Sequence, residues 1–357
     1  MSTVLYVILA ILVLGVCIIL HELGHFLAAR ACGIHVEEFS IGMGPAIFQK
    51  QGKETKYSLR ALPFGGYCAF IGEDAEDDDP DPRSLNRRPA WQRLIMTAAG
   101  PITNFLLSLV LAVVLMAVIG QVAVVNRIAT VTEDSPAAIA GLQAGDSVIG
   151  VYGLETEDVE SIQTIMDSHG TEPVELMISR DGQKKNVTVE RRYDEESGRY
   201  LMGITFATER ARIGLFTAIK SSVTYCIELF REMVKALLTM FTDKEVMDSM
   251  AGPVGTVQMM TEFTKESFSE SFTEGITMLL NLVVIISMNL GLMNFLPAPA
   301  LDGGRVVLLI LECVTGKHMN RKVEATVHMV GLFILLGLIV VLTGRDVFRL
   351  FKGSFFG

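Results

Sequence analysis

A five-residue segment near the N-terminus, His21-Glu22-Leu23-Gly24-His25, contains residue types that bind metals and transfer protons. On a helix, residues four apart lie on the same face, so the imidazoles of His21 and His25 can reach one metal ion. Glu22 follows the first imidazole, where its carboxylate can accept a proton from a water molecule at the metal. The pattern predicts one bound Zn2+ ion and a hydrolytic reaction.

The position of this motif within an apolar segment supports a functional role. At a rise of about 1.5 Å per residue, a helix would place His21 roughly 25 Å from Val4, and the next basic residue is Arg30. Ionisable side chains at such a depth in a membrane are costly unless they are paired or bind a metal. The alternative is that neighbouring helices satisfy these side chains without a metal.

A catalytic zinc ion usually has three protein ligands and an open fourth position, so a third ligand must come from elsewhere in the chain. Asp302, in the segment NFLPAPALDGGR at the end of the third apolar segment, is the best candidate. Pro297 and Pro299 would break the helix, and Gly303 and Gly304 would let the backbone bend so that the carboxylate turns inward. A DG turn that only ends a helix is the alternative explanation.

The composition predicts a polytopic α-helical membrane protein. Half of the 357 residues are hydrophobic, 20% are charged and the mean hydropathy is +0.43, which indicates membrane spans. The net charge of -10 argues against nucleic acid as a partner. Four segments are long and apolar enough to cross the bilayer: residues 4–29, 94–119, 278–296 and 327–342.

The segments between these spans have different characters. Residues 36–71 are predicted to form a β-hairpin sheet of short strands, and the acidic run 73–81 to be a solvated loop. Residues 214–241 carry apolar side chains at helical spacing with charges among them, which is typical of a surface helix. We therefore expect amphipathic helices over residues 208–275 and no fifth span there.

Residues 121–207 are predicted to form a separate soluble domain. Within it, the segment SPAAIAGLQAGDSVIGVYG has turn glycines, Gly141 and Gly145, that flank a short helix and precede a strand. This segment resembles a PDZ domain of the bacterial protease type, which binds a peptide by adding it to a sheet edge. A spacer domain without a ligand is the alternative. The domain would divide the membrane catalytic core into residues 1–120 and 276–357.

Charge distribution predicts the orientation. Four arginines stand before the second span and no basic residue precedes the first, so the loop between them should be cytoplasmic: Arg83, Arg87, Arg88 and Arg93. The motif and Asp302 then both lie near the cytoplasmic side, and the soluble domain is extracytoplasmic, provided that residues 214–241 do not cross. Three basic residues near the C-terminus would lie outside, against this trend: Arg345, Arg349 and Lys352.

The motifs together resemble the site-2 protease family of intramembrane metalloproteases, in its bacterial branch with a single PDZ domain. Nearly the whole chain carries them in the family's order: HELGH, GMGP, PFGGY, AAGPITNF, the PDZ-like segment, AGPVG and NFLPAPALDGG.

The resemblance implies a location in the bacterial inner membrane and assigns roles to named residues. His21, His25 and Asp302 would bind zinc, and Glu22 would be the catalytic base. Asn294 would contact the substrate backbone or the developing oxyanion, or alternatively bond a carbonyl freed by the helix break. The strand at Gly42, Met43 and Gly44 would pair with an unwound substrate segment, unless these glycines serve only as turn residues.

The implied substrates are single-span membrane proteins, including anti-sigma factors and remnant signal peptides. Two other classes of protein compete with this interpretation. A secondary transporter would show inverted repeats and many more spans, and a membrane-anchored scaffold would need no metal.

Overall fold

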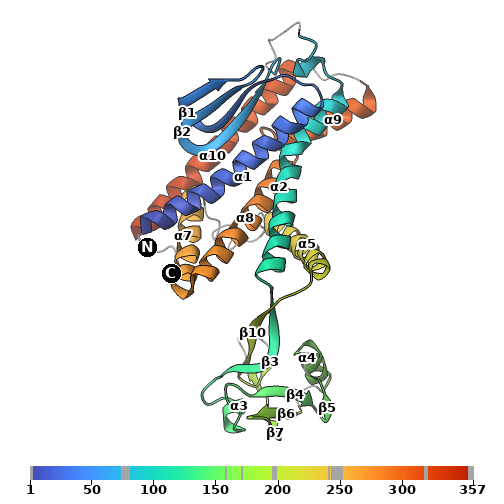
Figure 1. The fold of residues 1–357 in the computed structure, drawn as a ribbon, viewed down its shortest axis with the longest axis vertical. Coiled ribbons are helices and arrows are strands. Elements are labelled where there is room, and N and C mark those ends of the chain that lie inside the picture. Colours follow the sequence, from blue (N-terminus) through green and yellow to red (C-terminus); the bar gives the residue numbers. More distant parts are fainter. Residues whose placement is uncertain are drawn as a thin grey trace. The chain divides into compact units, whose positions relative to one another are not determined.

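A computed structural model of the chain describes residues 3–73, 81–156, 159–169, 172–194, 199–239, 242, 252–316 and 321–352. The chain forms two compact units: residues 1–115 together with 215–357, and residues 116–214 (Figure 1). Most of the acidic run 73–81, predicted to be a solvated loop, lies outside the described residues.

Four of the described helices are long and apolar enough to cross a membrane, which confirms the predicted polytopic membrane protein: α1 (Thr3–Ala31), α2 (Ala90–Val118), α8 (Phe272–Phe295) and residues Val323–Arg349 of α10 (Arg321–Lys352). Each of the four helices begins before its predicted apolar range. At α8 the reason is an N-terminal cap, because the Ser271 hydroxyl accepts the backbone N–H of Glu274 at 3.0 Å. Hydropathy does not register such a polar first turn.

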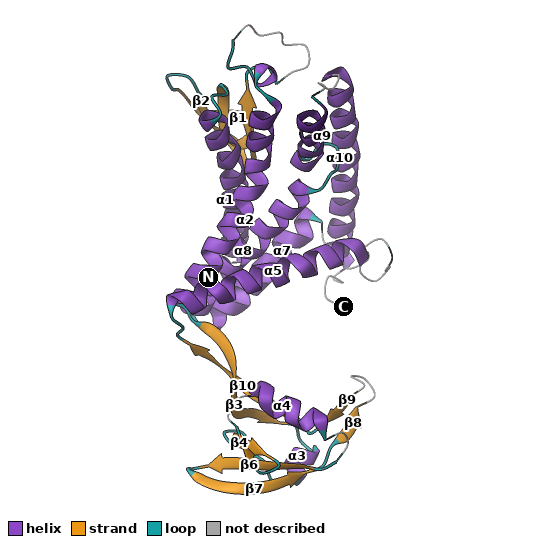
Figure 2. Ribbon diagram, turned by 90° about the vertical axis from the view of Figure 1, so that its right-hand side faces the viewer, coloured by secondary structure: helices purple, strands orange, loops and turns teal. Residues whose placement is uncertain are grey.

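The described residues of this unit form three further α-helices: α5 (Leu215–Thr239), α7 (Pro253–Glu270) and α9 (Asp302–Thr315). α5 is not among the four candidate spans, and it lies crosswise to α1 and α2 (Figure 2). One of its faces buries Ala218, Ser222 and Cys226, while Phe216 and Ile227 are exposed on another. The assignment of α5 as a surface helix stays a prediction.

A buried carboxylate joins α7 to α10. Asp346 of α10 accepts the backbone N–H groups of Gly252 at 3.1 Å and Gly255 at 2.8 Å. A Cβ atom at Gly252 would lie only 2.7 Å from Asp346 Oδ2. The Gly252–Gly255 part of the AGPVG segment therefore forms the N-cap and first turn of α7, capped by a side chain from α10.

Residues 36–71 form two long strands, β1 (Val36–Gln51) and β2 (Lys56–Phe70), and not a simple hairpin of short strands. Each strand bends back on itself. Residues 38–41 therefore pair on one side with residues 56–59, with residue numbers rising together, and on the other side with residues 66–69, with residue numbers running oppositely. Residues 46–51 pair with the other side of residues 56–60. The two strands thus build a four-segment sheet in which residues 66–70 form one edge.

This sheet packs on α1 through an apolar layer that also includes Met96 of α2 and Leu85 of the short helix η1 (Leu85–Arg87). Phe39 and Phe70 of the sheet contact this layer beside Phe26 of α1. Because Phe26 directly follows His25, the packing fixes the sheet beside the HELGH motif.

The 116–214 unit has its own apolar core and contains a sheet of order β10-β3-β4-β6-β7, with β5 paired to β4 and a separate β8-β9 pair. Its elements are β3 (Gln121–Val131), α3 (Pro136–Ile139), β4 (Ser147–Val151), β5 (Leu154–Glu155), α4 (Val159–Ser168), β6 (Val174–Arg180), β7 (Gln183–Val189), β8 (Arg192–Asp194), β9 (Arg199–Leu201) and β10 (Ile204–Ala211). The short helix α3 lies before Gly141 and Gly145, not between them. Both glycines have positive φ, which explains the residue choice.

An ion pair in this unit gives its stability a pH dependence. Arg180 donates to both carboxylate oxygens of buried Asp146, at 2.6 and 2.7 Å, and these bonds hold the pKa of Asp146 below its ordinary value of 3.8. The stabilisation is complete above pH 3.8 and is lost as the pH falls through the lowered pKa.

We expect Asp146→Asn to reduce the unfolding free energy of this unit by about 2–3 kcal/mol at neutral pH and to remove this acid sensitivity. Hydrogen exchange of β4 and β6 amides in the full-length protein measures both effects. Glu155→Gln, which breaks the exposed pair with Lys184, is the matched control and should change stability by less than about 1 kcal/mol. Equal effects of the two substitutions would contradict the expectation.

Candidate metal and catalytic centre

The structure brings His21, His25 and Asp302 together, although they come from opposite ends of the chain. Asp302 Oδ2 lies 3.1 Å from His21 Nε2 and 3.3 Å from His25 Nε2, and the two Nε2 atoms are 3.2 Å apart. Both histidines are buried. Among the described residues, these three form the one group of His, Cys, Asp or Glu side chains whose ligand atoms lie within 4.8 Å of one another.

This set of donor atoms fits zinc. Two imidazole nitrogens and one carboxylate oxygen make up a ligand set found in catalytic zinc sites, which keep a further position open. An adjoining cavity of about 230 Å3 supplies the open side, lined by His21, Glu22, Asn294 and Asp302 among others. The remaining metal positions can therefore be reached from a space that also contains Glu22 and Asn294.

The close packing of α1 on α2 determines how the imidazoles lie. His25 Nδ1 donates to the backbone carbonyl of Met96 at 2.9 Å, which turns Nε2 of this ring toward Asp302. Gly100 of α2 faces the two rings, and a Cβ atom there would lie 2.2 Å from His25 Nε2. On α1, a Cβ at Gly24 would lie 2.6 Å from the carbonyl oxygen of Ala99. Glycine is required at both positions by this helix contact.

We expect Gly100→Ala to displace the imidazoles, because a methyl group at this position overlaps His25. A displacement of the reacting groups by about 1 Å can cost 10²-fold in rate. Cleavage assays and zinc titration of the purified variant measure the loss. Gly337→Ala in α10 is the matched control, since nothing lies within 4 Å of a Cβ there, and it should leave both properties unchanged. Wild-type zinc affinity in Gly100→Ala would contradict this view of the contact.

Asp302 is the first residue of α9 and does not stand at the end of the third span, which stops at Phe295. Gly303 and Gly304 belong to the first turn of α9 and pack against backbone: a Cβ at Gly303 would lie 2.2 Å from the Leu296 carbonyl oxygen. These glycines therefore allow α9 to start close behind α8. The bend itself is at Ala300, which has φ of 72°.

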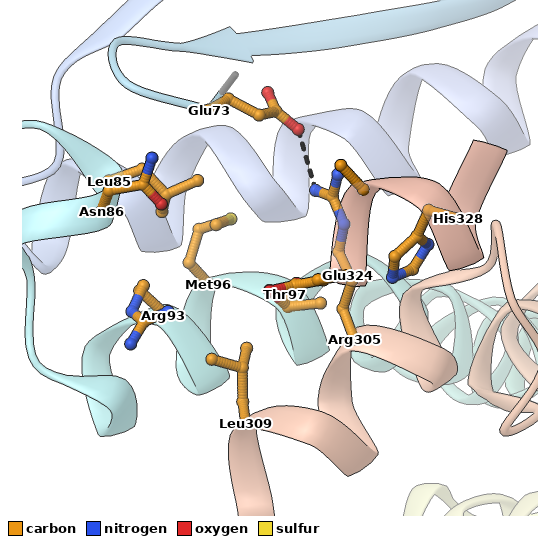
Figure 3. A pocket seen from close by; sticks show the side chains of 11 residues that line it. Glu73, Leu85, Asn86, Arg93, Met96, Thr97, Arg305, Leu309, Glu324 and His328 are labelled. Atoms are coloured by element: carbon orange, nitrogen blue, oxygen red, sulfur yellow. Dashed lines mark hydrogen bonds and ion pairs between the residues drawn. The ribbon is translucent and has the colours of Figure 1, made fainter. Parts of the chain in front are cut away.

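Ala300 also links this loop to α10, because its backbone N–H donates to His328 Nδ1 at 3.1 Å. Two ion pairs hold α9 against the first half of the chain. Arg93 of α2 pairs with buried Glu312, and Arg305 pairs with Glu73, after β2, at 2.8 Å. Figure 3 shows the pocket between these elements, with the Glu73–Arg305 contact drawn across it. Asp302 is thus carried on a helix fixed at several points.

Glu22 lies next to the edge segment of the sheet. A Cβ at Gly66 would lie 3.3 Å from Glu22 Cγ, so the backbone of β2 passes directly over this side chain. Asn294, in the last turn of α8, lines the same cavity as Glu22.

Gly42, Met43 and Gly44 lie where β1 bends. Both glycines have positive φ, and a Cβ at Gly42 would lie 2.5 Å from the Leu62 carbonyl oxygen. Met43 is paired with Leu62, and Arg60 Nη1 donates to the Gly44 carbonyl at 2.8 Å. The described contacts of this segment are therefore made within the sheet, and its pairing with a substrate stays a prediction.

Several residues around the centre were not selected by sequence reasoning. The segment AAGPITNF was noted only through the resemblance, yet it supplies Gly100 and also Asn104, whose Nδ2 lies 3.3 Å from His21 Nδ1. His328, which accepts the Ala300 N–H, lies outside the sequence motifs. A glycine in a neighbouring apolar segment is a sequence signal for close helix packing. A single histidine outside any motif gives no such signal.

The profile of peptidase family M50 matches residues 9–338. The chain belongs to peptidase family M50. This result confirms the resemblance to the site-2 proteases, since M50 is their family.

Curated relatives of this M50 peptidase match it over nearly its full length. A protein of Clostridium acetobutylicum named as a zinc metalloprotease is 33% identical over 96% of this chain and 97% of its own. The zinc metalloprotease RasP of Geobacillus kaustophilus is 30% identical, over 96% and 97% respectively. The regulator of sigma-W protease RasP of Bacillus subtilis is 27% identical, over 97% and 99%.

Proposed function

We propose that this M50 peptidase is a zinc endopeptidase that cleaves the transmembrane segments of single-span membrane proteins. The observation that carries the proposal is the convergence of His21 and His25, from the candidate span α1, with Asp302 at the start of α9. Zinc is the cofactor, in keeping with the relatives' names, and these three residues are its ligands. When bound, zinc supplies a Lewis acid that activates water and polarises the scissile carbonyl.

The chain's own residues supply proton transfer and positioning. The Glu22 carboxylate accepts a proton from the attacking water and donates it to the nitrogen of the leaving amine. Asn294, which lines the same cavity, donates from its amide to the substrate carbonyl oxygen or to a neighbouring backbone group. A helical substrate must unwind to present its carbonyl, and an unpaired strand edge offers replacement hydrogen bonds.

The substrates are membrane proteins whose outer part has already been shortened, such as anti-sigma factors and remnant signal peptides. The Bacillus subtilis relative, named as a regulator of sigma-W, supports the first class. The arginines before α2 support a cytoplasmic location for the loop between the first two spans, in the inner membrane of a bacterial cell. On this orientation the metal centre lies toward the cytoplasmic side.

The 116–214 unit is a PDZ-like domain on the extracytoplasmic side that restricts which substrates enter or binds their peptide ends. Its compact core and antiparallel sheet support this role. We expect removal of residues 121–207 to admit substrates with longer outer domains while short transmembrane substrates are still cut. Cleavage of tagged substrates of graded size tests this, and a truncated protein inactive on every short substrate would contradict it.

Cleavage of a single-span substrate by the purified protein in detergent tests the proposed activity. Chelator treatment should abolish cleavage and zinc should restore it. His21→Ala should bind little zinc. This loss would distinguish a zinc enzyme from a scaffold or a transporter, neither of which needs zinc at His21. Full cleavage by chelated protein, or wild-type zinc content in His21→Ala, would overturn the proposal.

A further inference from the structure

The side chain of Asn104 is completely buried between α1, α2 and α8 and reaches the outer nitrogen of His21. Its Nδ2 lies 3.3 Å from His21 Nδ1, on the side of the ring away from Asp302. Its Oδ1 is buried and has no hydrogen-bond partner among the described residues. A buried acceptor left without a hydrogen bond is destabilising, so its position requires an explanation.

Metal binding by His21 supplies one. A histidine that binds a metal through Nε2 carries its proton on Nδ1 and needs an acceptor at that atom. At His25 the acceptor is the Met96 carbonyl. At His21 the described neighbour of Nδ1 is the Asn104 amide. A half-turn of this amide exchanges Nδ2 for Oδ1, which satisfies both the Nδ1–H of His21 and the unpaired oxygen.

The backbone of Asn104 is held by hydroxyl groups from two helices. Its carbonyl accepts from Ser108 Oγ at 3.1 Å and from Ser287 Oγ of α8 at 2.9 Å, and Ser108 Oγ also reaches the Val284 carbonyl at 2.9 Å. Asn104, Ser108 and Ser287 are all fully buried. This network fixes the residue beside His21 within an apolar helix bundle, where polar groups are retained for specific roles.

We propose that Asn104 is a positioning residue of the metal centre, whose Oδ1 accepts the Nδ1–H of His21 and so directs the Nε2 lone pair to zinc. This inference rests on the proposed function, because it takes His21 as a zinc ligand. The two histidines are then oriented by different means, one by a backbone carbonyl and the other by a side chain.

Zinc affinity of the purified full-length protein, measured by competition with a chromogenic chelator, tests the inference. Asn104→Leu keeps the approximate size and removes the acceptor, and it should weaken zinc binding about 10–100-fold, as is typical for loss of such a partner. Asn104→Asp can only accept and should bind zinc at least as tightly as the wild type. Saturating zinc should restore most of the cleavage by Asn104→Leu. If Asn104 instead contacted the substrate, added zinc would not restore cleavage.

Asn289→Leu is the matched control, because this amide lies exposed on α8, and it should leave zinc affinity unchanged. If Asn104→Leu does not fold, Asn104→Asp still decides: weaker zinc binding in that variant shows that the amide acts as a donor and overturns the inference. Unchanged affinity in folded Asn104→Leu also overturns it while the proposed activity stands. Wild-type zinc content in His21→Ala would instead mean that the proposed function itself has failed.

Discussion

Purified Glu22→Gln protein is expected to keep its zinc and to lose cleavage by about 10²–10⁴-fold, the usual contribution of a general acid–base group. The amide has nearly the same shape as the carboxylate but cannot accept the proton of the attacking water. Glu22 is not one of the three residues whose ligand atoms converge, so the metal centre should remain intact. Zinc content and single-turnover cleavage of a transmembrane substrate in detergent measure the two properties separately.

Retained turnover in zinc-loaded Glu22→Gln would rule out the role of this carboxylate. Loss of both zinc and activity would mean instead that Glu22 supports metal binding. Glu324→Gln provides a comparison, because Glu324 is a carboxylate that lines the neighbouring pocket and has no proposed role. It should cleave at the wild-type rate.

Asp302→Ala is expected to lower zinc affinity by more than the roughly 10–100-fold typical of an outer-shell partner, because it removes a proposed direct ligand. Cleavage at ordinary zinc concentrations should be lost with it. The start of α9 should stay in place, since Arg93–Glu312 and Arg305–Glu73 still hold that helix. Chelator competition gives the affinity, and thermal unfolding in detergent shows whether the protein remains folded.

Asp302→Glu separates ligand chemistry from placement. It keeps the carboxylate but lengthens the side chain, and it should bind zinc more tightly than Asp302→Ala while cleaving slowly, because the donor oxygen is displaced. A folded Asp302→Ala protein with wild-type zinc affinity would show that the carboxylate is not a ligand.

Hydropathy and one short motif were enough to predict much of this protein. The four spans depend on long apolar runs, which have few structural alternatives in a chain of this composition. HELGH predicted two side chains on one helical face, and the PAPALDGG segment predicted a chain break that presents Asp302. These features could be read from sequence because they depend on local spacing alone.

The remaining features depend on contacts between distant segments. The pairing of residues 38–41 with both ends of β2 cannot be seen in the alternation of side chains, because the bend decides it. The carbonyl of Met96 and the amide of Asn104 matter only once α2 packs against α1. The sequence suggests that Gly303 lets the backbone bend. In the structure, its lack of a side chain lets the start of α9 approach the Leu296 carbonyl oxygen closely. The functional assignments of all the candidate site residues, including Asn294 and Gly42 to Gly44, stay predictions.

The chain's two contributions to the metal centre lie in α1 and α9, near opposite ends of the sequence. A ribosome therefore releases the histidine helix long before it has made the carboxylate. Until the last third of the protein has been synthesised and inserted, the imidazoles lack their partner and no peptide bond is at risk. On the proposed ligand set, biosynthesis thus delays proteolytic competence until α9 has been synthesised and assembled with α1.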